Sequence, residues 1–176
     1  DSMYRVMRRL FGLLFALSMV LVLTTPVWAA SYTNQPAAIG FSEQTVSVDG
    51  ALAYILSQQQ DDGSFPAGFG SAAGATLDAV FAGAAAGGDV SVWVTCEGNP
   101  NPLDYLETVF ETYAVDAAST GKLVAGLVAA GRDPRSFVGE NLVQRVLDYD
   151  PKGTGSFGES ATAQAWAILG LASSRE

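Results

Sequence analysis

The sequence predicts an all-α protein with three helical hairpins, and two observations carry this prediction. In one set of segments apolar residues recur at spacings of three and four, which indicates helices with a single buried face. A second set, rich in Ala and Gly, is apolar almost all round, which a helix tolerates only when other elements cover most of it. The two kinds alternate along the chain, so each amphipathic helix is expected to pair with the apolar helix that follows it.

The first 30 residues follow the pattern of a secretory signal peptide. Three arginines lie before an apolar run over 10–23, and small residues follow as far as Ala30. We expect cleavage after Ala29 or Ala30, which makes the protein secreted or exposed at the cell surface; an uncleaved membrane anchor is the alternative. Residues 31–46, polar and interrupted by proline, are expected to link the leader to a repeat domain over 47–176.

Without the leader the chain is strongly acidic. Of 9 Lys or Arg and 18 Asp or Glu, three arginines and one aspartate fall in residues 1–30, which leaves a net charge of −11. A surface this negative repels phosphate backbones and anionic lipids, so we expect no nucleic-acid partner. Cys96 is the single cysteine, so no disulfide can form within the chain.

The three hairpins are expected at about 47–88, 101–131 and 134–175. The buried faces of their amphipathic helices are formed in turn by Leu52, Ile55 and Leu56; by Leu103, Leu106, Val109, Phe110 and Tyr113; and by Val138, Leu142, Val143, Val146, Leu147 and Tyr149. Asn101-Pro102 and Asp133-Pro134 are expected to cap the second and third of these helices, with proline in the first turn. Between the first two hairpins, residues 89–96 are expected to form an extended connector with Trp93 packed inward.

The apolar helices align without a gap. TLDAVFAGAAAG from Thr76, TGKLVAGLVAAG from Thr120 and TAQAWAILGLAS from Thr162 start 44 and 42 residues apart, and a period in this range indicates stacked helical hairpins. Gly87-Gly88 and Gly131 are expected to end the first two. The tripeptide Gly-Ser-Phe at 63–65 returns at 155–157, each time between an amphipathic and an apolar helix, so it is predicted to be the turn of the repeat.

This combination of an amphipathic helix, a Gly-Ser-Phe turn and a Thr-led, Ala-rich helix resembles the prenyltransferase and squalene oxidase repeat of secreted bacterial proteins. The resemblance covers about residues 46–175. It implies an α/α toroid, of which three hairpins are about half, with the amphipathic helices outside and the apolar helices inside. Proteins of this superfamily include terpenoid cyclases, prenyltransferase β subunits, cobalamin carriers and thioester domains, so it implies a small apolar or cobalamin-like ligand, or a protein partner.

The motifs that carry catalysis in this superfamily do not occur in the sequence. The cyclase acid motif Asp-x-Asp-Asp is missing, and the nearest pair, Asp61-Asp62, lies beside a turn where carboxylates usually cap backbone groups. There is no His for a zinc site, and Cys96 is not part of the thioester motif Cys-Gly-Glu-Gln. We therefore expect no catalytic residue and no cofactor, and hence a non-catalytic binding or interaction module. A cyclase fragment without its acid motif and a purely structural surface repeat are the alternatives.

Aromatic side chains are the candidate ligand-binding residues, namely Phe65, Phe69, Trp93, Phe157 and Trp166; packing between helices is the alternative reading of the same residues. Residues 66–71 form an insertion relative to the third hairpin, and insertions of this kind often collect on the binding face of a repeat protein. A weak calcium-loop alternative is formed by Asp148, Asp150 and Glu159, although Lys152 occupies a ligand position of that loop.

An open half-ring would leave the helix that starts at Thr162 uncovered. That helix carries a single polar residue, Gln164, between Ala163 and Leu171, whereas terminal repeat units usually have a polar outer face. We expect it either to self-associate, with Trp166 and Ile168 near the contact, or to be covered by missing C-terminal repeats.

Overall fold

The structure is a computed structural model that describes residues 41–175, with side chains from residue 47 onward. In this range the chain is all-helical and contains no strand, which confirms the all-α prediction. None of the described helices is long and apolar enough to cross a membrane. The elements are α2 (Phe41–Leu56), α3 (Ala72–Ala85), the 3-10 turn η1 (Val90–Val92), α4 (Pro102–Tyr113), α5 (Ala117–Ala129), α6 (Leu142–Asp148) and α7 (Ala161–Ser173).

The predicted leader, its cleavage site and residues 31–40 of the predicted linker lie outside the described residues. Residues 41–46, which were predicted to belong to the linker, form the first turns of α2 in the structure. The helix continues through this segment because residues 41–48 contain neither Gly nor Pro, the two residues that most often interrupt a helix.

Side-chain caps explain where most of the helices begin. At α4, Asn101 accepts hydrogen bonds from the backbone N–H groups of Leu103 and Asp104, and the Asp104 carboxylate accepts one from the N–H of Asn101. This reciprocal capping box, with Pro102 in the first turn, confirms the start predicted for this helix. Glycines with positive φ follow α3 and α5 and end both helices, as predicted: Gly87 (76°) and Gly131 (71°).

The third amphipathic helix is shorter than predicted. α6 starts at Leu142 with Asn141 as its N-cap, so the prediction that Asp133-Pro134 caps it is wrong. The Asp133 side chain instead accepts a hydrogen bond from the N–H of Arg135, which makes a local turn rather than a helix start.

A tight turn with two positive φ values follows at Val138 (52°) and Gly139 (81°). The N–H of Glu140 donates to the carbonyl of Phe137 across this turn. Val138 was predicted to lie on the buried face of the helix, but it is half-exposed in this turn.

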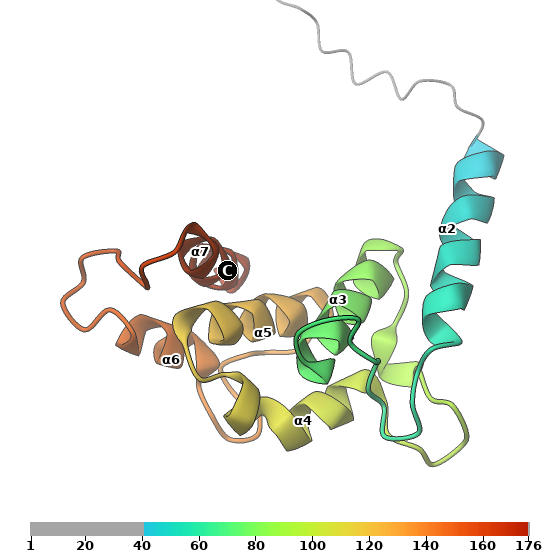
Figure 1. The fold of residues 1–176 in the computed structure, drawn as a ribbon, viewed down its shortest axis with the longest axis horizontal. Helices are drawn as coiled ribbons and strands as arrows, with labels where there is room; N and C mark the ends of the chain where they lie inside the picture. Colours follow the sequence, from blue (N-terminus) through green and yellow to red (C-terminus); the bar gives the residue numbers. More distant parts are fainter. Residues whose placement is uncertain (1–40, 176) are drawn as a thin grey trace, which may run out of the picture. The chain divides into compact units, whose positions relative to one another are not determined.

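α5 lies at the centre of the fold and contacts α3, α4, α6 and α7 (Figure 1). Leu123, Val124 and Leu127 of α5 are fully buried. α4 packs on α3 as well as on α5, with Leu103, Leu106 and Phe110 turned inward, which confirms the face predicted for it. The ring of Phe110 meets that of Phe137 edge to face at a centroid distance of 5.8 Å, so the segment before α6 also covers the core.

α5 and α7 approach one another so closely that their backbones touch. A Cβ atom added at Gly121 would lie 2.6 Å from the carbonyl carbon of Trp166, and one at Gly170 would lie 2.6 Å from the carbonyl oxygen of Gly121. In Figure 1 α7 is seen almost along its axis while α5 runs across the view, so the two helices cross at this point. Only glycine permits this approach.

α2 and α7 are less covered than the other helices. α2 reaches the core through its last turns, where Leu52, Ile55 and Leu56 are partly buried, and it does not lie along α3 as a paired helix would. α7 buries Ala167 and Gly170 against α5 but exposes Ile168 (57%) and Leu169 (51%). Of the two residues expected on the uncovered side of this helix, Ile168 is exposed, whereas Trp166 is half-buried and stacks on Phe81.

Candidate functional site

An apolar groove lies beside α3 in the described part of the chain, and we call it the α3 groove. Its volume is about 370 Å³. Ala75, Asp78 and Ala79 of α3 form one side, and the end of α2 and the turn after it form the other. The lining residues are Tyr54, Ile55, Gln58, Phe65, Pro66, Ala75, Asp78 and Ala79.

The first Gly-Ser-Phe turn places Phe65 in the wall of the groove. Gly63 has a φ of 85°, and a Cβ atom there would lie 2.9 Å from the carbonyl oxygen of Pro100, so no side chain fits. The backbone N–H of Phe65 donates to the hydroxyl of Thr76, which itself donates to the carbonyl of Ala72. These bonds tie the turn to α3 and confirm that Gly-Ser-Phe is a turn between the two helices.

Trp93 packs against Phe65, one of the residues that line the groove. It is buried, as predicted for the connector, and its ring meets that of Phe65 edge to face at a centroid distance of 6.4 Å. The Gln59 side-chain amide donates to the carbonyl of Trp93 at 3.0 Å, which satisfies a polar group inside the core. Gly83 of α3 leaves the space that this ring fills, since a Cβ there would lie 2.6 Å from its Cζ2 atom.

A lysine–carboxylate pair borders the groove where α3 meets α5. The Lys122 ammonium lies 2.6 Å from the Asp78 carboxylate and donates to the carbonyl of Gly74. It also lies 5.4 Å from the ring centroid of Trp166, within the range of a cation–π contact. Trp166 in turn stacks on Phe81 at 5.8 Å. The Lys122 side chain is only 14% exposed, so the pair links α3, α5 and α7 while Asp78 remains open to solvent.

Tyr113 is the neighbouring group with the most perturbed ionisation. Burial of its phenol raises the pKa of Tyr113 to about 12, and the negative charges of Asp78 and Asp116 add to the effect. Burial followed by the charge of Asp62 also raises the pKa of Tyr105. Both phenols therefore remain neutral at physiological pH.

Asp61 and Asp62 are used in local hydrogen bonds. The Asp61 carboxylate accepts from the hydroxyl of Thr95 and the amide of Asn99, which holds the connector against the turn. Two hydrogen bonds from Ser64 lower the pKa of Asp62, and the bond from the hydroxyl has a larger effect than the bond from the backbone N–H. A catalytic proton donor requires a raised pKa, so the shift of Asp62 has the wrong sign for this role.

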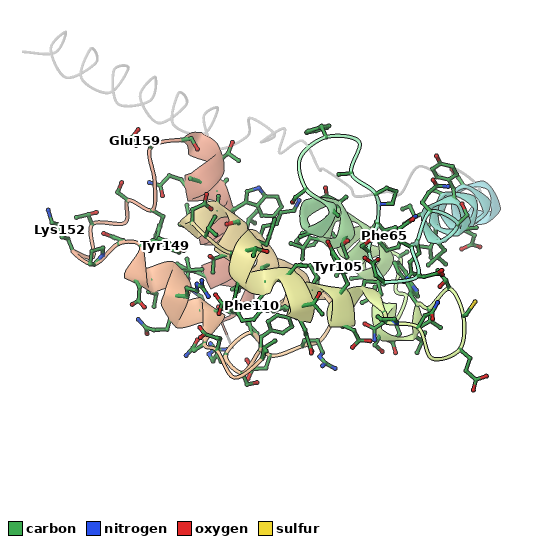
Figure 2. All side chains as sticks on the ribbon, turned by 60° about the horizontal axis from the view of Figure 1, so that its bottom comes forward. Phe65, Tyr105, Phe110, Tyr149, Lys152 and Glu159 are labelled. Carbon is green, nitrogen blue, oxygen red and sulfur yellow. The ribbon has the colours of Figure 1, made fainter. Side chains whose placement is uncertain are left out.

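The structure does not bring the calcium-loop residues together around one point. Asp150 accepts hydrogen bonds from Thr154 and Gly155 of its own loop. These bonds lower the pKa of Asp150, and the bond from the backbone of Thr154 has the largest effect. Asp148 accepts from the Gln144 amide on α6. Figure 2 shows Lys152 at the outer tip of the loop and Glu159 near the start of α7. Among the described residues there is no group of three metal-binding side chains in range of one ion.

The predicted ligand-binding aromatics occupy separate places. Phe65 and Trp93 form the buried pair beside the α3 groove, and Trp166 is the half-buried ring over Lys122. Phe157 is half-buried at the second Gly-Ser-Phe turn, where its N–H donates to the side chain of Gln164. Phe69 is 97% exposed on the 66–71 insertion. Of the five, only Phe65 lines the groove.

Sequence reasoning missed most of the groove residues, including Tyr54, Ala75 and Asp78. One signal was present: Asp78 and Lys122 both occupy the third position of the aligned apolar segments, so opposite charges at equivalent positions marked the contact between α3 and α5. The alignment of the third segment was two residues out of register, because Gln164, not Thr162, has the role of Thr76 toward the preceding Phe.

Comparison with known proteins gives no match for this chain, whether with protein-family models, with curated proteins or with solved structures.

Proposed function

We propose that the chain is an exported, non-catalytic binding module that holds an apolar partner in the α3 groove. The observation that carries the proposal is the groove itself, which is open to solvent and is lined by the alanines of α3 on one side and by Phe65 on the other. Its volume of about 370 Å³ falls within the range of about 300–1000 Å³ that is usual for binding pockets. Tyr54 at its rim is 67% exposed among the described residues, which gives the groove an aromatic surface open to a partner.

Aspartates around the turn support a non-catalytic role. Asp61 and Asp62 hold the turn and the connector in place, and the pKa of Asp62 is lowered. Asp78, the acid among the residues that line the groove, is paired with Lys122. Each of these carboxylates thus has a structural partner that explains its position.

We further propose that the chain consists of hairpin repeats of the prenyltransferase and squalene oxidase type. Two repeated contacts support this. The N–H of Phe65 is bound by Thr76 of α3, and that of Phe157 by Gln164 of α7. Leu77 of α3 packs on Gly126, and Gly121 of α5 packs on Gly170. Gly126 and Gly170 each lie ten residues after the N-cap of their helix, Asp116 and Ser160, since 126 − 116 and 170 − 160 both equal 10.

The repeat proposal extends to part of an α/α toroid, in which α3, α5 and α7 form the inner layer. The contacts of α5 with both α3 and α7 support this order. The crossing of α5 and α7 is the feature that a regular ring does not explain.

A neutral hydrophobic dye such as Nile red tests the binding role of the groove. Ala75→Glu places a charge on the groove wall, and Ala53→Glu places the same charge on an exposed position of α2 as a matched control. We expect dye fluorescence to fall in the first variant and to stay at the wild-type level in the second. Equal dye binding by both variants would show that the groove is not a binding site.

A further inference from the structure

We propose that the partner held in the α3 groove is helix α7 of a second copy of this chain, so that copies join head to tail. This inference rests on the proposed function, because it names the partner of the same groove. Each chain then offers two different surfaces, the groove on α3 and the exposed side of α7. We call the latter the α7 face, and it consists of Ala165, Ile168, Leu169 and Ala172.

The α7 face corresponds to a surface that is already a helix contact within the chain. Thr120 and Gln164 lie at equivalent positions of α5 and α7, each four residues after its N-cap, since 120 − 116 and 164 − 160 both equal 4. Counted from these positions, Ala165, Ile168 and Leu169 of α7 correspond to Gly121, Val124 and Ala125 of α5. The three α5 residues are buried, and Gly121 is in direct contact with α7.

The α3 groove corresponds to the surface that receives such a contact. The hydrogen bonds from Phe65 and Phe157 mark Thr76 and Gln164 as equivalent positions of α3 and α7. Two and three residues further on lie Asp78 and Ala79 of α3, and Trp166 and Ala167 of α7. On α7 these positions pack against α5, with Ala167 fully buried. On α3 they line the open groove.

The distribution of charge favours this partner over an unrelated acidic surface. Helix α7 contains no charged residue between Ala161 and Ser173, in a chain with twice as many acids as bases. It can therefore approach another acidic chain without bringing further charge of the same sign to the contact. Asp78 at the rim of the groove is already neutralised by Lys122, so the contact requires no new ion pair.

The same reasoning predicts the sign of the salt dependence. Two copies of this acidic chain repel one another at low ionic strength, and salt screens this repulsion. An apolar contact between them should therefore become tighter as salt is added. A contact built on ion pairs would become weaker.

Light scattering on the purified chain over a range of concentrations tests the proposal. We expect a mass of at least twice the monomer, a loss of this association in Ile168→Glu, and the same loss in Ala75→Glu. Leu147→Glu on α6 and Ala53→Glu on α2 are matched controls at exposed positions, and both should associate like the wild type. Circular dichroism of each variant checks that it is folded, and Leu169→Glu replaces Ile168→Glu if the latter is not.

Mixing the two defective variants distinguishes a head-to-tail contact from a symmetric one. The Ile168→Glu chain keeps its groove and the Ala75→Glu chain keeps its α7 face, so the mixture should form dimers although each variant alone is monomeric. Association that survives Ala75→Glu but not Ile168→Glu would show an α7-to-α7 contact and overturn the proposal. A chain that stays monomeric while its groove binds dye would also overturn it, and would leave the proposed binding function standing. Loss of both dye binding and association would overturn both.

Discussion

Replacing Gly121 by alanine should destabilise the protein, because the added methyl group meets backbone that cannot move by changing a rotamer. It would lie 2.6 Å from the carbonyl carbon of Trp166 and 2.8 Å from the N atom of Ala167, well inside van der Waals contact. Overpacking usually costs about 1–3 kcal/mol, and a backbone contact should fall near 3 kcal/mol. The higher helix propensity of alanine stabilises the helix by about 1 kcal/mol, so the free energy of unfolding should fall by about 2 kcal/mol in total.

The assay for this prediction is thermal unfolding followed by circular dichroism. At this chain length about 1 kcal/mol corresponds to about 3–5 °C, so Tm should fall by about 6–10 °C. Gly50→Ala in α2 is the matched control, since nothing lies within 4 Å of the added methyl group. That variant should melt at or slightly above the wild-type temperature. A Gly121→Ala protein as stable as the wild type would show that α5 and α7 do not touch at Gly121.

Three further predictions concern groups around α3 and α5. Thr76→Val removes the acceptor of the buried Phe65 N–H and should lower the free energy of unfolding by about 1–3 kcal/mol in a denaturant titration. Thr120→Val should be neutral or stabilising, because the buried Thr120 hydroxyl has no hydrogen-bond partner among the described residues. Equal losses in the two variants would contradict this. Because the pKa of Tyr113 is raised to about 12, the stability due to its neutral phenol is complete below pH 10, near the unfolded pKa, and is lost between about pH 10 and 12. Unfolding curves of Tyr113→Phe should lack this loss, and an unchanged pH profile would show that Tyr113 is not the group responsible. Gly83→Ala should displace the ring of Trp93, lowering Tm and changing tryptophan fluorescence; an unchanged emission spectrum would mean that the ring does not lie on Gly83.

The sequence predicted the helices well where local signals decide. Periodicity located the buried face of α4, and Asn101-Pro102 marked its start because cap and proline chemistry act within one turn. Asp133-Pro134 carries a similar signal but forms a turn, since Asp133 bonds to the N–H of Arg135 and the next segment reverses at Gly139. Neighbouring residues thus override a cap signal when they favour a turn more strongly.

The candidate site was harder to predict because it depends on contacts between distant segments. The groove joins Tyr54 on α2 to Ala75 and Ala79 on α3, and neither hydrophobic periodicity nor the repeat indicates how α2 is placed. Nor does the alignment of the apolar segments predict that α5 and α7 meet backbone to backbone at Gly121. The repeat family itself remains a prediction, as does the closure of the helices into part of a ring.

The turn before α6 contains a residue whose replacement should stabilise the protein. Val138 has a left-handed backbone conformation, with φ at 52°, which a β-branched residue adopts at a cost of about 1–2 kcal/mol. Asn tolerates this conformation far better, and Asn-Gly is the preferred pair for a turn with two positive φ values. The side chain of Val138 is half-exposed, so its replacement sacrifices little packing. A Val138→Asn background would therefore give a reserve of stability for purifying variants, such as Gly121→Ala, that weaken the helix crossing.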